Sequence, residues 1–400
     1  MLVYSFLLRL ATMFGPTKRL PGHEGYEILL TGSFYSDNWL MSHLRPLALS
    51  QKSARVRIVS TWPVPALAKV EAIYPPQWLI RMIGSVPARM ITFLWIGLCT
   101  RPHIVGGFHL LLNGLTAALL GRCIGARSLY FCVGGPAEVL GGGIASENRL
   151  FERLRVADTI VEQQLLHVVN SFDFVIAMGS RTVKFFQQCG IRAPIYVISG
   201  GIDEQQFHST GAVPASDLIL VCRLAAIKRV DLFLRTVQQV QSTLPGVTAT
   251  VVGDGVLRDN LEQLAQDLGL MNNVKFVGYQ QDVGNWLRRA KVFVLTSDSE
   301  GLPLSTMEAM MCGVPVVASL VGDLPDLVDD GVNGYLISER TPEAFATRIL
   351  DLLRNEERLS NFAKAARKSA ERHKVQAAIQ TWDTVLAAES LTLSHKQCAA

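Results

Sequence analysis

Two basic side chains stand near each other in the stretch VCRLAAIKRVD, where Arg223 follows an apolar run and Lys228 precedes a helical pattern. Arginine offers a planar fork of donors and lysine a compact charge, so two such cations at a strand-to-helix turn are suited to bind a diphosphate. The spacing alone is a weak signal, because basic pairs at strand ends are more often solvated.

Two carboxylates follow the next candidate strand, in the stretch TSDSEGLPLSTMEAMMCGVPVVAS. Pro303 is suited to the first helical position, where the unpaired N–H groups of the first turn attract an anion or a hydroxyl group. Glu300 stands just before this turn, and Glu308 stands inside the helix, roughly 7 Å from Pro303 along the helix axis. An exposed helix glutamate is the simpler interpretation of Glu308, but its neighbours are apolar and a carboxylate among them needs a partner. Two carboxylates placed in this way can accept hydrogen bonds from two hydroxyl-bearing groups, such as a sugar and a ribose.

These side chains need a scaffold that brings strand ends together, and the chain has the pattern of one. Short β-rich runs alternate with longer helical patterns, which is typical of parallel α/β sheets. In open sheets of this kind ligands lie beyond the carboxyl ends of the strands, so two facing domains would hold a ligand in the cleft between them. The predicted strands are residues 27–30, 55–60, 103–105, 128–133, 173–177 and 195–198 in the first half, and 217–222, 249–252, 274–277, 292–295, 314–318 and 335–337 in the second. The predicted helices include residues 230–241, 257–268, 303–311, 342–353, 356–372 and 375–388.

A chain of 400 residues is long enough for two domains of roughly 200 residues each. Hydrophobic residues make up 49% and charged residues 18%, a balance that supplies large cores and excludes disorder. The polar segment 200–216 has the glycines, proline and small residues of a linker. We therefore expect two doubly wound, Rossmann-like domains over residues 1–205 and 206–372. A C-terminal helix and tail over residues 373–400 is expected to pack back towards the first domain.

The apolar composition raises the question of a membrane span. The strongest candidate is the uncharged stretch between Arg101 and Arg122, but its two histidines, asparagine, proline and four glycines fit a strand, a turn and a helix better. The opening MLVYSFLLRLATMF is a poor signal peptide, since Arg9 interrupts its apolar run. Seven cysteines that are never spaced as CxxC argue against a disulfide framework or a zinc cluster, and we expect them to be buried.

The two halves of the chain differ in charge. Residues 1–200 carry a net charge of +9 and residues 201–400 one of −5. A basic, apolar first half is suited to an anionic surface, and a membrane is favoured because no nucleic-acid-binding module is recognisable. The segment from Trp78 to Trp95 carries Arg81 and Arg89 among apolar residues. This segment is either an interfacial amphipathic element or a helix packed on the first sheet.

Glu300 and Glu308 form an E-x7-E motif within the pattern EG-x-P-x4-EAM-x2-G-x-PVVA. This pattern resembles that of the retaining nucleotide-sugar glycosyltransferases of glycosyltransferase family 4, which have the GT-B fold. The segments VCRLAAIKRVD, VVGDGVLRDNLE, VKFVGYQQDV and LVDDGVNGYLI match in the same order. The resemblance is strong over about residues 173–372 and holds only in outline over the first half. It implies a donor domain over residues 206–372 and an acceptor-side domain over residues 1–205.

The resemblance also implies roles for the matching residues. Arg223 and Lys228 would bind the donor diphosphate and stabilise the leaving nucleotide. Glu300 would contact the donor sugar, which completes the predicted catalytic set, and Glu308 would hold the ribose hydroxyls. Preorganised cations and helix N–H groups would stabilise the charge that develops as the anomeric bond breaks, so we expect no metal and no other cofactor. The donor site would further include Gly301, Leu302, Pro303, Leu304, Gly253 and Gly32, of which the turn glycines also have a purely structural interpretation.

The first half departs from the family pattern at two places. Gly32 stands alone where family members usually carry a glycine-rich loop, and Cys132 stands near the place of a frequent histidine. A cluster that follows this predicted strand would border the cleft, either as an acceptor- or phosphate-contacting loop or as a mobile loop. His109 follows another strand and either faces the acceptor or is a structural histidine. The predicted acceptor-side residues are His109, Gly134, Gly135 and Glu138.

Together these observations predict a hexosyltransferase-type, retaining glycosyltransferase. It would move a sugar from a UDP- or GDP-sugar to a glycan or lipid-linked acceptor, in cell-surface or exopolysaccharide synthesis. The predicted location is the cytoplasm, with peripheral contact at the inner face of an anionic plasma membrane. Two alternatives stay open, namely a catalytically silent GT-B partner in a polysaccharide assembly complex and a nucleotide-sugar epimerase or phosphorylase.

Overall fold

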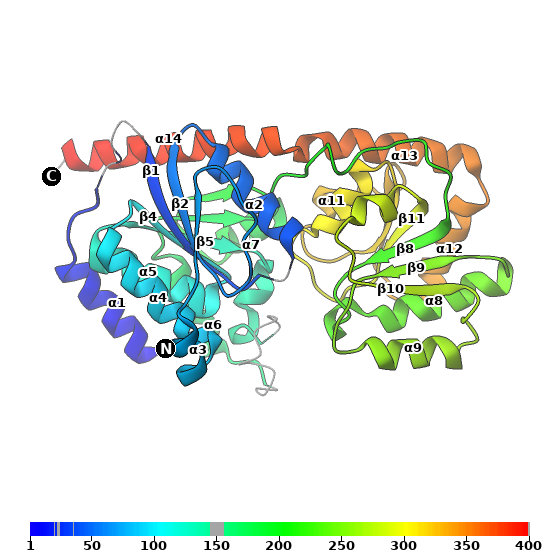
Figure 1. Cartoon of the computed structure of the whole chain (residues 1–400), viewed down its shortest axis with the longest axis horizontal. Coiled ribbons are helices and arrows are strands. Elements are labelled where there is room, and N and C mark those ends of the chain that lie inside the picture. The colour runs from blue at the N-terminus through cyan, green and yellow to red at the C-terminus, as the bar shows by residue number, and fades with distance from the viewer. Residues whose placement is uncertain (20, 22–24, 35, 145–155, 399–400) are drawn as a thin grey trace. The chain divides into compact units, whose positions relative to one another are not determined.

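The computed structural model describes residues 1–19, 21, 25–34, 36–144 and 156–398 (Figure 1). The chain divides into two compact units. Unit 1 consists of Met1–Gly201 and Val375–Ala400, and unit 2 of Ile202–Lys374. The last helix of the chain thus belongs to the same unit as the first two hundred residues.

Unit 1 is built on a seven-stranded sheet with the strand order β3-β2-β1-β4-β5-β6-β7, in which every neighbouring pair is parallel. The chain reverses its direction of travel across the sheet between β1 and β4, so the loops after these two strands meet at one edge. The strands are β1 Tyr26–Thr31, β2 Ser53–Val59, β3 Val70–Ile73, β4 Ile104–Phe108, β5 Arg127–Cys132, β6 Phe174–Ala177 and β7 Ile195–Val197.

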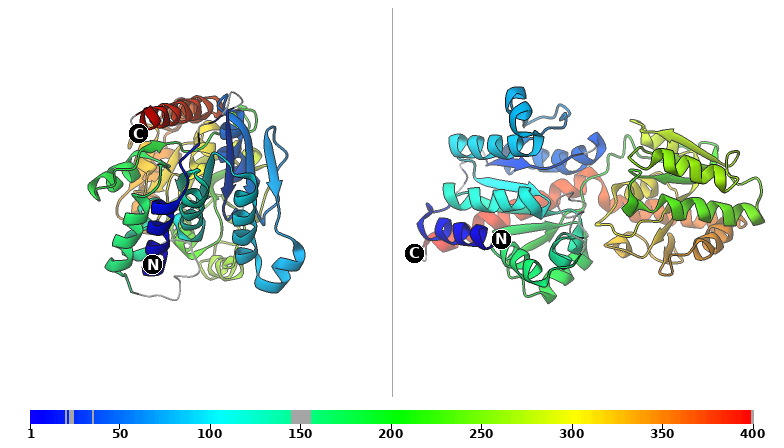
Figure 2. Two further views of the ribbon diagram at one scale, coloured as in Figure 1. Left: turned by 90° about the vertical axis from the view of Figure 1, so that its left-hand side faces the viewer. Right: turned by 90° about the horizontal axis from the view of Figure 1, so that it is seen from below.

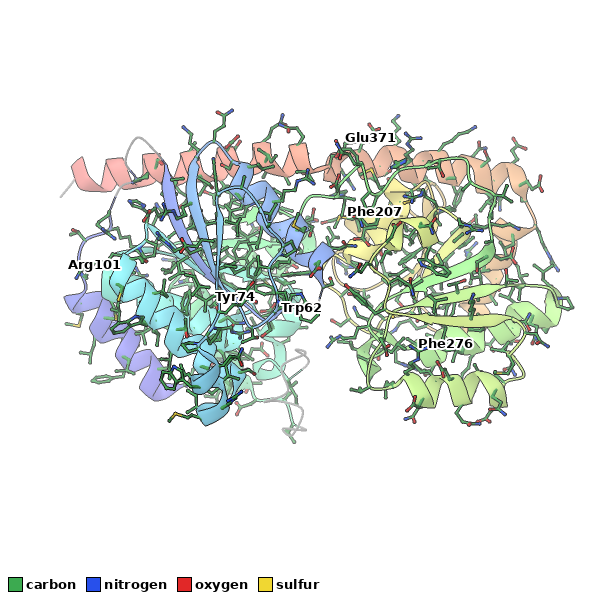
Figure 3. All side chains as sticks on the ribbon, viewed as in Figure 1. Trp62, Tyr74, Arg101, Phe207, Phe276 and Glu371 are labelled. Carbon is green, nitrogen blue, oxygen red and sulfur yellow. The ribbon has the colours of Figure 1, made fainter. Side chains whose placement is uncertain are left out.

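Six of these strands were predicted, and β3 was missed. Its sequence VEAI has one acidic residue among four and stays partly exposed along its length. A short edge strand of this kind lacks the continuous apolar run that marks a buried parallel strand. The segment between β2 and β3 is held by side chains, since Val64 N–H donates to the Tyr74 hydroxyl (3.0 Å) and the Trp62 indole donates to Asp37 (3.0 Å) (Figure 3).

Helices cover both faces of the unit 1 sheet (Figures 1 and 2). On one face α1 and α4 both pack on α5, and the buried side chains of Leu8, Phe93 and Leu120 help to fill the core beneath them. On the opposite face α14 packs on α2. The helices of unit 1 are α1 Leu2–Phe14, α2 Asp37–Leu49, α3 Gln77–Ile83, α4 Ser85–Thr100, α5 Leu115–Ile124, α6 Thr159–Val169, α7 Ser180–Gln188 and α14 Val375–Cys398.

Unit 2 has a six-stranded parallel sheet with the order β10-β9-β8-β11-β12-β13, and all six of its predicted strands are confirmed. The strand order reverses between β8 and β11, which places the loops after these two strands side by side. The strands are β8 Ser216–Val221, β9 Ala249–Val252, β10 Val274–Gly278, β11 Ala290–Leu295, β12 Val316–Ser319 and β13 Gly334–Ile337. The helices are α8 Val230–Thr243, α9 Arg258–Asp267, α10 Val283–Leu287, α11 Leu304–Met311, α12 Pro342–Leu353 and α13 Glu356–Ala370.

The uncharged stretch between Arg101 and Arg122 forms β4, a distorted turn over Leu110–Gly114 and the start of α5, as predicted. Within the described part of the chain, no helix combines the length and the apolar character that a membrane span requires. The six cysteines whose side chains are described are free thiols. The expectation that they are all buried is wrong, because Cys99, Cys123 and Cys189 are exposed.

Candidate active site

Lys228 and Glu300 meet where the loops after β8 and β11 lie side by side in unit 2. The Lys228 ammonium donates to both carboxylate oxygens of Glu300, at 2.7 and 2.9 Å. The two side chains are only 17% and 8% exposed, so each charge depends on the other for compensation. Two residues that lie 72 positions apart in the sequence therefore form one buried ion pair.

The backbone of these two loops is held together by further hydrogen bonds. The Thr296 hydroxyl makes bonds to the carbonyl oxygens of Lys228 (3.1 Å) and Arg229 (2.9 Å). Asp298 N–H donates to the carbonyl of Ile227 (2.8 Å). Thr296 is fully buried, so its hydrogen bonds fix the backbone that carries Lys228 and thereby the position of the ion pair.

The segment Gly301–Pro303 leads from Glu300 into α11. This helix begins at Leu304, so Pro303 is the residue before the first helical residue and not, as expected, the first one itself. Gly322, in the loop after β12, supports the segment from the other side. Gly322 has a φ of +54°, and a Cβ there would overlap the carbonyl oxygen of Glu300. Asp323 N–H donates to the carbonyl of Gly301 (2.9 Å), which joins a third loop to the site.

Gly322 was missed at the sequence level. The available signal was a glycine three residues beyond the end of a strand, in the stretch SLVGD, but only the backbone shows why a side chain is excluded.

Glu308 lies within α11 with only 5% of its surface exposed. Within the described residues, no donor forms a hydrogen bond or an ion pair with its carboxylate. Burial raises the pKa of this carboxyl group to about 8. The Glu308 carboxylate therefore lacks the hydrogen-bond partner that its surroundings predict, and hydroxyl groups of a ligand would be suitable donors.

Arg223 follows β8 and is partly exposed. Its neighbour Cys222 is partly exposed, but burial of the thiol raises the pKa of that thiol to about 12, and the thiol lies within electrostatic reach of Lys228, Glu300 and Arg223. Gly253 follows β9 with a φ of +132°, and a Cβ there would overlap the Cys222 carbonyl oxygen. The loop after β9 can therefore approach the loop that carries Arg223 only because residue 253 is glycine.

A second group of predicted residues meets in unit 1, around the buried carboxylate of Glu138. This carboxylate accepts hydrogen bonds from His109 Nδ1 (3.0 Å), Leu110 N–H (2.7 Å), the Tyr130 hydroxyl (2.9 Å) and Gly134 N–H (2.6 Å). Burial acts to raise the pKa of Glu138, but His109 and the two N–H groups outweigh it, so this pKa lies below its ordinary value. Glu138 is a charged anchor that joins the loops after β4 and β5.

His109 is held in an unusual conformation. Its φ of +65° lies in the left-handed region, and such a backbone costs of order 1–3 kcal/mol in a residue with a side chain. Leu112, in the same loop, has a φ of +63°. The His109 side chain is 33% exposed while its Nδ1 is bound to Glu138, so the imidazole has a fixed orientation at the surface of unit 1.

Gly32 and Gly135 lie at the same edge of the unit 1 sheet. A Cβ at Gly32 would lie 2.9 Å from the Cβ of Phe108, the last residue of β4. Gly135 has a φ of +65° and opens a short 3₁₀ turn that ends at Glu138. Gly32, predicted in the donor site, is therefore surrounded by residues of unit 1.

Arg89 distinguishes the two interpretations of the segment from Trp78 to Trp95 at one position. Only 3% of it is exposed, so at this position the packed helix is the correct interpretation. Its guanidinium donates to the Gly32 carbonyl (2.5 Å), the Ser33 hydroxyl (3.1 Å) and the Asn113 side chain (2.9 Å). Arg89 thus ties the loop after β1 to the loop after β4. Sequence reasoning missed Asn113 altogether, since nothing marks it within the apolar run LLLNG.

The fold of the chain is GT-B, shared with solved structures of about the same length. HepE of Anabaena, solved in complex with UDP and glucose, superposes with a TM-score of 0.70 at 20% identity and covers 90% of this chain and 99% of its own. Sucrose-phosphate synthase of Thermosynechococcus elongatus gives a TM-score of 0.71 at 17% identity, over 91% of this chain and 100% of its own. The predicted α/β class with two doubly wound domains is confirmed.

Residues 203–369, nearly all of unit 2, match the family model described as glycosyl transferases group 1. Among the relatives, the poly(ribitol-phosphate) alpha-N-acetylglucosaminyltransferase of Staphylococcus aureus (strain COL) is 30% identical over 164 residues, which is 40% of this chain and 33% of the relative. The matched part of the chain spans less than half the length of each of the first relatives. Within the described residues, no group of three or more histidine, cysteine or acidic residues could hold a metal ion.

Proposed function

We propose that this protein is a retaining glycosyltransferase of family 4 that moves a sugar from a UDP- or GDP-sugar to a glycan or lipid-linked acceptor. The observation that carries the proposal is the buried Lys228–Glu300 pair at the point where the unit 2 sheet reverses its strand order. Ligands of open α/β sheets bind at such points. The match of residues 203–369 to the glycosyl transferases group 1 family model supports the same proposal.

In the proposed donor site, different residues bind the diphosphate, the sugar and the ribose of the nucleotide-sugar. Arg223 and Lys228 bind the diphosphate, Glu300 orients Lys228 and contacts the sugar, and Glu308 accepts hydrogen bonds from the ribose hydroxyls. The N–H groups at the start of α11 add a positive dipole end beside the diphosphate. The UDP and glucose in the HepE structure support a nucleotide-sugar as the donor.

The chemistry of the proposed reaction is charge separation. As the anomeric C–O bond breaks, negative charge develops on the departing diphosphate and positive charge on the sugar ring. Cations that are already in place stabilise this charge without reorganisation, and Lys228 is held by Glu300 in such a position. The proposal needs no metal ion.

On the acceptor side we place His109, held by Glu138, together with the turn at Gly134 and Gly135. The strained backbone of His109 supports this role, because residues in sparsely populated conformations cluster at functional sites. Glu138 would act through His109, since its own oxygens accept four hydrogen bonds within unit 1.

The names of two relatives support a place in cell-surface or exopolysaccharide synthesis. The S. aureus relative is named for poly(ribitol-phosphate) and one of Bacillus subtilis for poly(glycerol-phosphate). The proposal includes a cytoplasmic protein in peripheral contact with an anionic inner membrane face, which the basic and apolar first half of the chain supports.

A thermal-shift screen with UDP, GDP, ADP and their sugars tests the donor site. A ligand that binds only the folded state stabilises it by RT ln(1 + [L]/Kd), so UDP or GDP and their sugars should raise Tm. Glu308→Gln should reduce the shift, and Glu357→Gln, at an exposed glutamate of α13, should not. If no nucleotide or nucleotide-sugar raises Tm, the silent-partner alternative is correct. Product analysis with the donor alone separates a transferase from an epimerase.

A further inference from the structure

Three helices of unit 1 turn large apolar side chains outward. On α1 the exposed residues Phe6, Leu10 and Met13 follow an i, i+4, i+7 spacing. On α4 the exposed residues Ile91, Trp95 and Leu98 repeat the same spacing, and on α3 Trp78 and Met82 are one turn apart. Met13 is 74% exposed, Trp95 65% and Trp78 62%. Side chains at these spacings share one side of a helix, so each helix presents an apolar stripe.

Helix α4 departs from the pattern of an ordinary surface helix. Besides Phe93, the residues that it buries are small or polar, namely Ala88, Arg89, Thr92 and Gly97, while a tryptophan, an isoleucine and a leucine point outward. A helix that packs on a sheet in water normally buries its largest apolar residues and exposes its arginines. The outward residues of α4 are therefore suited to apolar surroundings that the chain itself does not provide.

The three helices belong to one continuous layer. Both α1 and α4 pack on α5, and α3 packs on α4 (Figures 1 and 2). The guanidinium of Arg19, just after α1, donates to the carbonyl of Arg101 at the end of α4. We name the exposed side chains of α1, α3 and α4 the apolar face, which consists of Phe6, Leu7, Leu10, Met13, Trp78, Met82, Ile83, Val86, Ile91, Trp95 and Leu98.

The segments that supply the apolar face carry no acidic residue. Residues 1–23 and 72–137, which supply α1, α3, α4 and α5, contain no aspartate or glutamate. Arg9, Arg19, Arg81 and Arg101 are exposed within these segments. A second copy of this chain would set arginines against arginines with no acid to pair them, which disfavours self-association through this face. A bilayer with anionic lipids supplies both the apolar interior and the negative headgroups.

We infer that the apolar face docks on an anionic bilayer, with α1, α3 and α4 lying in the plane of the interface. The inference rests on the peripheral membrane contact in the proposed function and names the surface that makes it. No described helix is suited to span a membrane, whereas helices with an apolar stripe and flanking arginines bind at the interface. The arginine stems can lie along the apolar layer while their heads reach lipid phosphates.

Vesicle co-sedimentation tests this inference, with phosphatidylcholine vesicles and with vesicles that also contain phosphatidylglycerol. The full chain should bind the anionic vesicles at low salt and be released at high salt. Trp78→Ser, Trp95→Ser and Met13→Ser should each lower the partition coefficient by about tenfold. Met271→Ser is the matched control, because this residue is 66% exposed in unit 2 and should leave binding unchanged.

The outcomes separate the surface from the rest of the proposed function. If the full chain binds anionic vesicles and the three variants bind equally well, another surface makes the contact and the inference is wrong. If light scattering instead shows an oligomer that Trp95→Ser dissociates, with no vesicle binding, the face is an interface between copies. The Tm shift with UDP or GDP should be the same in all these variants as in the unmodified chain. If the unmodified chain shows no Tm shift but binds anionic vesicles, the donor site is contradicted and the membrane surface is not.

Discussion

At the scale of single residues, the proposed donor site combines a buried ion pair with a buried carboxyl group that has no partner within the described residues. Lys228 and Glu300 neutralise each other, whereas Glu308 is buried with no donor within the described residues. A ribose that brings two hydroxyl groups would satisfy the Glu308 carboxylate and favour its ionised form. The protonation of this one group therefore links pH, stability and nucleotide binding.

Glu308→Gln should make stability less dependent on pH. The folded-state pKa of about 8 lies above the ordinary value of 4.5, so folding favours the neutral acid. This contribution is fully present below about pH 4.5 and is lost as pH rises towards 8. Relative to the unmodified chain, the variant's free energy of unfolding should therefore increase by up to about a few kcal/mol between pH 5 and 9. The difference in Tm between the two proteins should increase over the same pH range. A Tm difference that stays constant across this range would contradict the assignment.

Nucleotide affinity should follow the opposite trend in the unmodified chain. Because the ribose would bind the ionised carboxylate, the Kd for UDP or GDP should fall as pH rises through about 8, and titration calorimetry would measure it. In Glu308→Gln this pH dependence should disappear.

At the scale of elements, close approach between loops sets the geometry of unit 2. Gly253 allows the loop after β9 to pass the Cys222 carbonyl, and its φ of +132° excludes an ordinary side chain. Gly253→Ala should destabilise the protein by roughly 2–4 kcal/mol and weaken nucleotide binding. Gly246→Ala is the control, because a Cβ there meets nothing within 4 Å. Equal denaturation midpoints for the two variants would show that the loops are not in contact.

Helix α14 is fixed to the unit 1 sheet by a buried ion pair. Arg127 of β5 bonds to the carboxylate and the carbonyl of Glu389, and the Tyr196 hydroxyl donates to the same carboxylate (2.9 Å). Glu389→Ala would leave the Arg127 charge buried without a partner and should cost about 3–5 kcal/mol. Urea denaturation measures this loss. Glu371→Ala, at a more exposed pair with Lys374, should change stability by less than about 1 kcal/mol.

The same elements show what the sequence could and could not indicate. The buried parallel strands were predictable, because continuous apolar runs leave few other conformations. The edge strand β3 was not, since its residues are only partly buried. The surroundings of Arg89 stayed open between two interpretations, because the pattern shows that an arginine lies among apolar residues but not which way it points. The Glu138 network joins side chains from separate loops, and only the fold brings them together.

At the scale of the whole molecule, the two units have different characters. Unit 2 carries the family match and the acidic half of the sequence. Unit 1 carries the basic excess, the apolar face and the His109–Glu138 pair. This division agrees with a donor that is bound by one unit and an acceptor that is met by the other. The central claim of the proposed function is sugar transfer at the Lys228–Glu300 pair of unit 2.

Sugar transfer by charge-altered variants tests that claim most directly. The measurement is release of UDP or GDP from the donor that gives the largest thermal shift, in the presence of a lipid-linked or glycan acceptor. Lys228→Ala and Glu300→Ala should each lower the rate by roughly 100-fold or more, while Lys275→Ala, at an exposed lysine of β10, should leave it unchanged. The double variant Lys228→Ala/Glu300→Ala leaves no unpaired charge behind, so it should fold and remain inactive. Full transfer by either folded single variant would contradict the assignment of Lys228 and Glu300 to catalysis.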